Sequence, residues 1–250
     1  MNFFSEWDYI RIHSTPILTY LTSSLQTSLQ NQTKREGYEK VTSLRSGVKL
    51  TLMKKKEQIQ IDKKLKEILK NGTLLTFSDG CKYTGMTKPD PKNKDKLIPE
   101  GLGFAMWSDG QSYKGQYKNG TFDGWGNYKT PGSHELIGTW KEGFIISGEM
   151  KFEDGRHYVG EFKNSKHHGN GTMNYSGNKE YEGQWKDGDA HGKGKLTYLK
   201  NYEQHEKGTI YEGTYKNGDQ HGEFIITFPD GDILESTYVN GQRTKHKWRD

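Results

Sequence analysis

The sequence predicts a mainly β fold: an elongated, single-layer antiparallel meander of β-hairpin repeats, preceded by a small α-containing N-terminal extension. Three observations support this prediction. A short motif returns at a nearly fixed interval, aromatic rings and glycines alternate with polar residues inside it, and Asn-Gly or Asp-Gly pairs separate the alternating runs. Self-similarity of this kind is typical of repeat architectures, in which each repeat packs mainly against its neighbours.

The repeat is clearest in two neighbouring segments, 158–178 and 181–198. Each opens with a tyrosine, then a glycine two residues later and an aromatic residue two beyond that; a turn, a Gly-x-Gly and a second apolar run complete it. The opening glycines are spaced by 30, 23, 22, 23 and 30 residues, so the period is 23 and the long intervals hold insertions at 87–99 and 199–209. These glycines are Gly85, Gly115, Gly138, Gly160, Gly183 and Gly213.

Side chains two residues apart share one face of a strand, so Tyr113, Gly115 and Tyr117 face one way and their polar neighbours the other. Glycine normally weakens a strand and marks a place where another group packs closely on the backbone. We therefore expect rings to lie flat over the glycine backbone of a neighbouring strand, which gives a single sheet an apolar layer, while the other face is wet. Phe224 departs from the pattern, because it stands where the second glycine of its unit belongs.

The repeats divide the chain into three parts. Residues 71–241 form the array, with about six repeats and partial units at its ends. Residues 1–70 form the extension, in which leucines at helical spacing predict an amphipathic helix over about 16–31. We expect this helix to cap one end of the array; a partner-binding helix and a mitochondrial presequence are the alternatives. Residues 242–250 are interpreted as a short basic tail.

The net positive charge of the chain is concentrated in the extension. Residues 34–71 hold 12 Lys or Arg against 5 Asp or Glu, whereas residues 100–250 hold 19 against 22. The run Lys54-Lys55-Lys56 is interpreted as a solvated turn, with contact to anionic lipid or to an acidic partner as the alternative. Further on, Ile61, Leu65, Ile68 and Leu69 are spaced as in a short helix.

No residue pattern indicates catalysis, a metal or a cofactor. His168, His191 and His221 occupy equivalent repeat positions, which lie two strands or about 9.5 Å apart. Zinc holds its ligands at about 2 Å, so these histidines are predicted to be turn residues and not a shared site. No phosphate-binding glycine motif stands between a strand and a helix. Cys81 is the single cysteine and has no evident catalytic histidine, which excludes an internal disulfide and suits a reducing compartment.

The units resemble the MORN (membrane occupation and recognition nexus) family, whose consensus is close to YxGxxxxGxxxGxGxxxxxDG. The segments Tyr113–Gly120 and Tyr211–Gly218 match its opening, and His191-Gly192-Lys193-Gly194 matches its return strand. The resemblance covers roughly residues 71–241. It departs at Leu136, Ser147, Phe224 and Ser236, where the sheet is expected to bend or end.

The resemblance implies a curved single-layer sheet that serves protein–protein contact, including self-association. MORN arrays also occur beside lipid-kinase or methyltransferase domains, for which 250 residues leave no room, so no enzymatic role is carried over. We expect a non-catalytic scaffold of a large cytoskeletal or ciliary axonemal assembly, similar to radial-spoke MORN proteins and located in the cytoplasm and cytoskeleton. Its partners would be other proteins of that assembly. Membrane lipid is not favoured, and the slight acidic excess of the array argues against nucleic acid.

The partner-binding residues are expected to be exposed aromatic rings on the glycine-bearing face. They are Tyr113, Tyr117, Trp140, Tyr158, Phe162, Tyr181, Trp185, Tyr211 and Tyr215. Two other functions stay open. One is a peripheral membrane adaptor that binds anionic lipid through Lys54, Lys55 and Lys56, and the other is an accessory subunit of a mitochondrial complex.

Overall fold

The computed structural model describes residues 9–10, 59–60 and 62–249. The chain forms two compact units, Met1–Gly126 and Asn127–Asp250. The helix predicted over 16–31, Lys54, Lys55, Lys56 and most of the basic segment lie outside the described residues, so those expectations stay predictions.

Strands of the first unit are antiparallel and follow the chain order. The strands of this unit are β1 (Tyr9–Ile10), β2 (Thr73–Phe77), β3 (Lys82–Pro89), β4 (Leu97–Met106), β5 (Ser112–Lys118) and β6 (Thr121–Thr130), of which β6 runs into the second unit. The extended β1 had no signal in the sequence. Its short backbone segment pairs with β2 through Tyr9 opposite Phe77.

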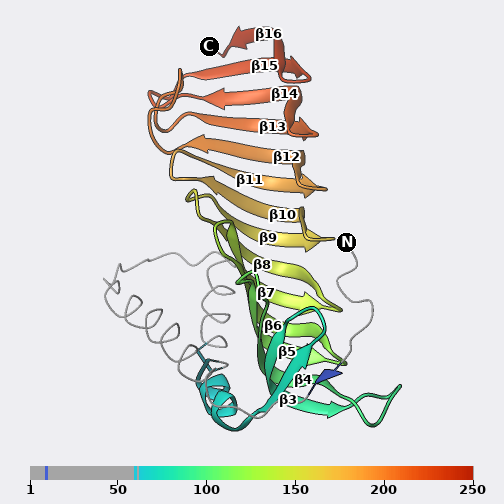
Figure 1. Ribbon diagram of the computed structural model, residues 1–250. Helices are drawn as coiled ribbons and strands as arrows, with labels where there is room; N and C mark the ends of the chain where they lie inside the picture. Colours follow the sequence, from blue (N-terminus) through green and yellow to red (C-terminus); the bar gives the residue numbers. More distant parts are fainter. Residues whose placement is uncertain (1–8, 11–58, 61, 250) are drawn as a thin grey trace. The chain divides into compact units, whose positions relative to one another are not determined.

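The second unit continues the same hairpin pattern, and in Figure 1 each of its strands lies beside the next one in the chain. Its strands are β7 (His134–Lys141), β8 (Phe144–Phe152), β9 (His157–Lys163), β10 (Lys166–Tyr175), β11 (Lys179–Lys186), β12 (Asp189–Tyr198), β13 (Ile210–Lys216), β14 (Asp219–Thr227), β15 (Ile233–Val239) and β16 (Gln242–Trp248). The predicted antiparallel meander of hairpins is confirmed.

The segment interpreted as a basic tail is strand β16. It pairs with β15 from Val239 opposite Gln242 to Leu234 opposite Trp248. Its side chains are all exposed and, except for Trp248, polar, so it lacks the alternation by which the other strands were recognised. Main-chain hydrogen bonds to β15, together with the contact of the Trp248 and Phe228 rings, hold it on the sheet.

Tyrosine rings lie over glycines, as expected. Gly160 pairs with Gly171 across β9 and β10, and a Cβ added to either glycine would fall far inside contact distance of the Tyr158 ring. The Tyr158 hydroxyl donates a hydrogen bond to the carbonyl of Glu161 at 2.9 Å, so the ring is laid along its own strand. The rings of Tyr83, Tyr113 and Tyr181 are placed in the same way, with their hydroxyls bonded three residues ahead.

Glycine is required at the two positions of each Gly-x-Gly for different structural reasons. Gly171 makes room for the tyrosine ring, whereas Gly169 has φ +60° and stands at a register shift between β9 and β10. A left-handed bulge of this kind favours glycine because other residues are strained there. The Glu161 carboxylate accepts the main-chain N–H of Asn170 at 2.9 Å, which satisfies a donor that the shifted ladder leaves unpaired.

Both classes of turn follow the predicted chemistry. Within hairpins, Asn119 and Gly120 have φ +51° and +82°, which is the left-handed pair of a tight type I′ turn. Between hairpins, the Asp154 carboxylate accepts the main-chain N–H of Arg156 at 3.0 Å, and Asp109 and Asp230 do the same two residues ahead. The sequence therefore fixes where the chain reverses at both edges of the sheet.

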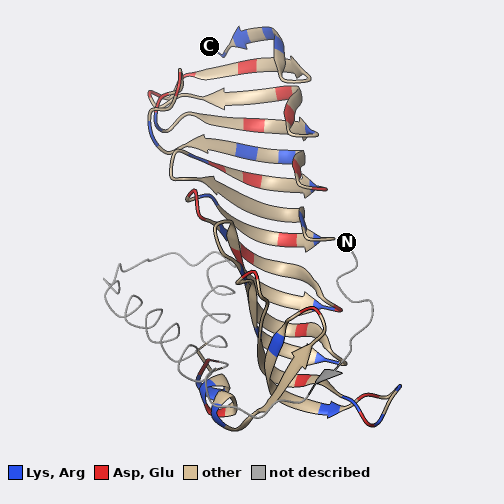
Figure 2. Cartoon of the chain, in the orientation of Figure 1, with Lys and Arg blue, Asp and Glu red and all other residues tan. Residues whose placement is uncertain are grey.

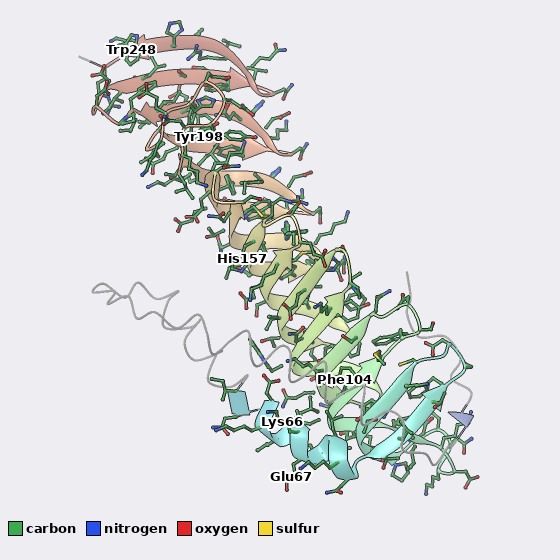
Figure 3. The ribbon with its side chains drawn as sticks, turned by 60° about the vertical axis from the view of Figure 1, so that its left-hand side comes forward. Lys66, Glu67, Phe104, His157, Tyr198 and Trp248 are labelled. Atoms are coloured by element: carbon green, nitrogen blue, oxygen red, sulfur yellow. The ribbon has the colours of Figure 1, made fainter. Side chains whose placement is uncertain are left out.

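A helix over residues 62–71 precedes β2, as the spacing of Leu65, Ile68 and Leu69 predicted. Leu65 and Leu69 are buried. The Asp62 carboxylate pairs with Lys114 Nζ at 3.1 Å, and Lys114 faces away from the ring-bearing side of β5. The helix therefore lies over the polar face of the first unit, where a wet surface was expected; Figure 3 labels its Lys66 and Glu67.

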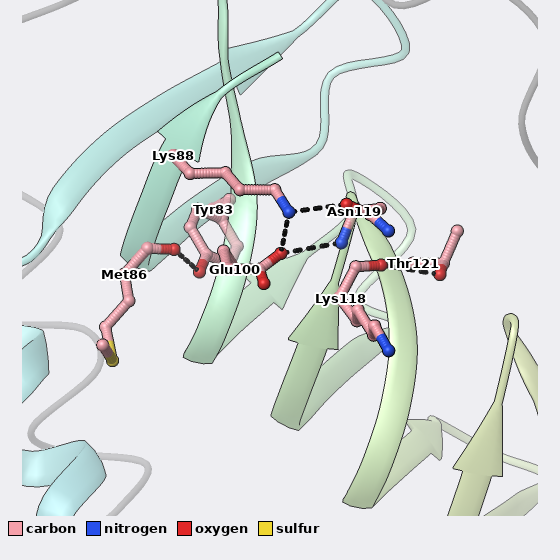
Figure 4. Close-up of polar contacts among 7 residues, drawn as sticks. All are labelled: Tyr83, Met86, Lys88, Glu100, Lys118, Asn119 and Thr121. Carbon is pink, nitrogen blue, oxygen red and sulfur yellow. Dashed lines mark hydrogen bonds and ion pairs between the residues drawn. The ribbon is translucent and has the colours of Figure 1, made fainter. Parts of the chain in front are cut away.

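The insertion at 87–99 lengthens the hairpin of β3 and β4 at its tip. Thr87 pairs with Pro99 and Pro89 with Leu97, so only residues 90–96 form a loop. At the base of this extension the Lys88 ammonium contacts the Glu100 carboxylate at 3.0 Å, and both bond the Asn119 turn (Figure 4). The main-chain N–H of Asn119, with help from Lys88, holds the pKa of Glu100 below its usual value.

The substitution Gly171→Ala tests the ring-on-glycine packing. Because the new methyl group would collide with the Tyr158 ring, we expect the free energy of unfolding to fall by about 1–3 kcal/mol. Denaturant unfolding followed by circular dichroism measures the change. Thr172→Ala, one residue along on the opposite face, is the control and should change stability by less than about 0.5 kcal/mol. Equal midpoints for the two variants would contradict the packing.

Candidate functional site

The nine rings expected to be exposed are buried. This expectation was wrong for Tyr113, Tyr117, Trp140, Tyr158, Phe162, Tyr181, Trp185, Tyr211 and Tyr215. The physical reason is that neighbouring rings pack against one another, mostly edge to face. Tyr158 meets Phe162 at 5.1 Å and Trp185 at 5.4 Å between ring centroids, both at nearly right angles. Their contact with a partner protein stays a prediction.

A cavity of about 500 Å³ opens on the ring-bearing face of the second unit. Its volume lies within the usual range of ligand pockets. We call it the tyrosine groove, and it is lined by Asp154, Arg156, Tyr175, Ser176, Asn178, Lys179, Tyr181, Ala190, Leu196, Tyr202, Tyr215 and Gly218. Of the nine predicted residues it brings together two, Tyr181 and Tyr215, and both belong to its lining although their side chains are almost fully buried.

Lys179, the first residue of β11, is surrounded by rings. Its Nζ lies 5.6 Å from the ring centroid of Tyr175, 6.0 Å from that of Tyr198 and 5.5 Å from that of Tyr202. We call this group the Lys179 cage. Aromatic faces attract an ammonium group without neutralising it. Among the described residues Lys179 has no ion pair, so its full charge faces the groove.

Arg156 occupies the same repeat position one unit earlier, two residues before the opening tyrosine. Its guanidinium lies 4.4 Å from the ring centroid of Phe152, just as Lys179 lies over Tyr175. Unlike Lys179, it has a carboxylate partner, since Nε of Arg156 lies 2.7 Å from Asp154. Burial raises the pKa of the Tyr175 hydroxyl between the two cations, although Arg156 partly offsets this. Tyr175 therefore stays a hydrogen-bond donor at neutral pH.

The insertion at 199–209 supplies one wall of the groove, and Phe224 explains how it is anchored. The Phe224 ring lies over Gly213, in the place that a tyrosine ring takes in other repeats. The Tyr211 hydroxyl is thus free of its own strand and forms a hydrogen bond with Nδ1 of His205 at 3.1 Å. The His205 ring also stacks on that of Tyr198, with ring centroids 4.3 Å apart, and the His205 backbone forms a β-bridge with that of Tyr202.

The three histidines predicted to be turn residues lie in strands β10, β12 and β14, so that prediction was wrong, although each of them contacts a turn. Nδ1 of His168, His191 and His221 each accepts a main-chain N–H from the turn of the following hairpin, at 3.4–3.5 Å. Another histidine, His167, stacks on Tyr158 with ring centroids 3.9 Å apart. Burial, with a smaller effect of Arg156, lowers the pKa of His167 to about 4. This ring is therefore neutral at physiological pH.

Other kinds of site find no support in the part of the chain that the structure describes. No group of three or more His, Cys, Asp or Glu side chains there could hold a metal ion. No helix within it has the length and apolar character needed to cross a bilayer. Cys81 is buried, and desolvation raises the pKa of its thiol to about 12, which keeps it protonated and unreactive.

Sequence reasoning missed the four residues that give the groove its chemistry. These are Arg156, Tyr175, Lys179 and Tyr202. A signal was present for the cations, because they stand at one repeat position that holds Cys81, Gln111 and Thr209 in other units. No signal pointed to Tyr202, since the contacts of an insertion depend on how its loop folds back.

Comparison with known proteins finds the repeat. Four segments match the model of the MORN repeat: residues 113–131, 158–178, 181–199 and 211–233. The chain is also similar to alsin of Homo sapiens and of Pan troglodytes, with 31% identity over 108 residues in both cases. Alsin of Mus musculus is 32% identical over 78 residues.

The likeness to alsin is confined to a small part of it. The human alignment covers 38% of this chain and 6% of alsin, and the mouse alignment covers 29% and 5%. This similarity supports the assignment of the repeats, and no function of alsin as a whole follows from it for this chain. MORN repeats are a non-catalytic family that mediates interactions with proteins or membranes. Two of the matched segments, 158–178 and 181–199, hold half of the residues that line the tyrosine groove, whereas Arg156, Lys179 and Tyr202 lie outside every matched segment.

Tyr211→Phe tests how the insertion is held. Loss of the hydroxyl removes the bond to His205, so we expect amide hydrogen exchange across 199–209 to become faster, with a stability loss of only about 0.5–1.5 kcal/mol. Hydrogen–deuterium exchange read by mass spectrometry measures the exchange of the insertion and of the surrounding strands in one experiment. The control is Tyr158→Phe, which removes the equivalent hydroxyl of another repeat. If both variants leave 199–209 protected, the proposed anchor is absent.

The low pKa of His167 predicts acid sensitivity. The unfolded chain binds a proton at this residue near its ordinary pKa of 6.5, whereas the folded chain does so only near 4. Stability is therefore lost as pH falls from about 6.5 towards 4, because protons favour the unfolded state. His167→Phe, which copies the Phe122 ring stacked on Tyr113, should remove this part of the pH dependence. Thermal midpoints between pH 7 and pH 4 that change in parallel for both proteins would refute it.

Proposed function

We propose that this chain is a non-catalytic scaffold that binds partner proteins through the tyrosine groove and so takes its place in a large assembly. The observation that carries the proposal is the groove itself. It combines a floor of rings fixed by the sheet with two cations and several hydrogen-bonding groups at its rim. Protein interfaces are enriched in tyrosine, tryptophan and arginine, which supply contact area at a small entropy cost.

The packing of the repeat makes the groove suitable for binding. Tyr181 is held by a hydroxyl bond to the carbonyl of Gln184 at 3.1 Å and by edge contacts with the rings of Trp185 and Tyr215. Side chains that are already ordered lose little conformational freedom when a partner docks. The groove therefore offers a preorganised surface, as expected of a scaffold and not of a mobile catalytic site.

We further propose that the assembly is cytoskeletal, as in ciliary radial spokes, and that the chain works in the cytoplasm or axoneme; self-association would be compatible with it. The resemblance of the repeats to stand-alone MORN scaffolds supports this proposed location. The membrane-adaptor and mitochondrial alternatives depend on the N-terminal segment, including Lys54, Lys55 and Lys56, which lies outside the described residues. No contact within the described part of the chain favours either of them.

Substitution inside the groove tests the proposal. Ala190 lines the cavity, so Ala190→Gln would fill part of it with a neutral side chain. Thr172→Gln is the matched control, because Thr172 lies on the opposite face of β10. Tagged full-length chains are used to capture proteins from native extract, and bound proteins are quantified by mass spectrometry. We expect a specific set of partners to be reduced at least about tenfold with Ala190→Gln and retained with Thr172→Gln.

Each result is decisive for the groove. Equal capture by the two variants, with both folded by circular dichroism, would show that partners do not use the tyrosine groove. Loss confined to Ala190→Gln would support it. Recovery of axonemal or other cytoskeletal proteins in that set would support the proposed assembly, whereas a set of mitochondrial or membrane-organelle proteins would overturn the address and keep the scaffold.

A further inference from the structure

The two cations of the groove form an ordered pair. Arg156 and Lys179 stand at the same position of consecutive repeats, each over the ring that precedes its turn. Equivalent positions of consecutive hairpins are separated by two strand spacings, or about 9.5 Å. Both side chains line the groove together with Tyr175, while the Ser176 hydroxyl donates to the carbonyl of Asp154 at 2.8 Å. The rim at this edge therefore combines two cations with the Tyr175 side chain.

Lys179 is the stronger of the two charges towards a ligand. The Asp154 carboxylate already neutralises part of Arg156 at 2.7 Å. The Lys179 cage, in contrast, orders an ammonium group between three rings and leaves it without a counter-ion among the described residues. A partly buried cation that lacks a counter-ion binds an incoming anion more strongly than a solvated one does, because little water has to be displaced.

The cage is completed by two departures from the repeat. The insertion at 199–209 brings Tyr202, and the Phe224 ring releases the Tyr211 hydroxyl that holds His205 beside it. In a regular repeat, neither the wall nor its anchor would exist. The insertion and Phe224 therefore both contribute to the Lys179 cage, although Phe224 lies 15 residues beyond Thr209, the last residue of the insertion.

We propose that the groove recognises an acidic, apolar-flanked segment of its protein partner, whose carboxylate docks on Lys179 in the tyrosine cage with Arg156 as a secondary contact. This inference rests on the proposed scaffold function and specifies the partner's chemistry. The apolar flank would lie over Leu196, Ala190 and the Tyr215 ring, which form the apolar part of the lining. The carboxylate satisfies Lys179, and the Tyr175 hydroxyl is available as an additional donor.

Charge distribution favours a peptide over a lipid surface. Binding to an anionic bilayer needs several neighbouring lysines or arginines. In the second unit, Lys and Arg alternate with Asp and Glu along the sheet (Figure 2), and the groove itself contains Asp154 beside its two cations. A concave site with one unpaired ammonium and a floor of rings matches a single acidic side chain next to an apolar one.

The test is a random-peptide phage library selected on the full-length protein, followed by fluorescence polarisation with synthetic peptides from the enriched clones. We expect the selected sequences to be rich in Asp and Glu beside apolar residues. Lys179→Glu should weaken their binding about tenfold, which corresponds to about 1.4 kcal/mol, and Tyr202→Ala should weaken it severalfold. Lys186→Glu makes the same charge change at the other end of β11 and should alter binding by less than about twofold.

The peptide chemistry is tested with matched probes. Replacing the selected glutamate by glutamine should weaken binding as much as Lys179→Glu does, and the two changes together should cost little more than either alone. Selection without an acidic preference, or equal affinity for the wild type and for Lys179→Glu, would overturn the proposal. Binding of phosphatidylserine vesicles that is lost with Lys179→Glu would assign the cage to lipid and overturn it as well.

The outcomes for the groove and for the cage are distinguishable. If selected peptides lose affinity with Ala190→Gln and not with Lys179→Glu, the groove binds protein segments by shape and the acidic preference is wrong. If they are insensitive to both variants, the scaffold function through this groove fails together with the inference. Circular dichroism of all variants confirms that a lost interaction is not a lost fold.

Discussion

A tyrosine ring laid across two glycines is the contact on which the rest of this structure depends. A single-layer sheet has no second sheet to cover its apolar face, so its own side chains must do this. Tyr158 covers the pair Gly160 and Gly171, and its only polar atom is satisfied by the Glu161 carbonyl. Without a Cβ at either glycine the ring can lie flat. Its edge contacts with the rings of Phe162 and Trp185 then continue the buried aromatic layer from one repeat to the next.

The same contact separates positions that the fold fixes from those it leaves open. Ring and glycine positions are constrained by close packing, and so are the bulge glycines with positive φ such as Gly169 and Gly192. The position two residues before the opening residue of a repeat is less constrained. It holds a buried residue at Cys81 and at Thr209, and a cation at the rim of the groove at Arg156 and Lys179. Binding chemistry can therefore change there without loss of the sheet.

Much of the fold could be predicted from the sequence, because its signals are local. The spacing of the glycines predicted the hairpins, and the pairs Asn119-Gly120 and Asp154-Gly155 predicted the turns. The spacing of Leu65 and Leu69 predicted the short helix. The placement of rings over glycines was predicted, but their full burial was not, because the repeat pattern does not show how neighbouring rings pack against one another. Strand β16 lacked the alternation altogether. The Lys179 cage depends on contacts between the turn at 176–178 and the insertion at 199–209, which no period encodes.

Phe224 shows how a departure from the repeat can be used and not merely tolerated. A bulky residue in place of a glycine would collide with a tyrosine laid along the strand, yet the Phe224 ring itself covers Gly213 and keeps the layer closed. Tyr211 then turns its hydroxyl to His205, and the insertion is tied to the rim beside Lys179. An extra loop costs little entropy as it lengthens, so one hydrogen bond and one stacked ring pair suffice to order it. The irregular repeat thereby makes one part of a uniform aromatic face different from the rest: the loop and the cation give the groove its distinct lining, and the packed rings beneath hold it in place.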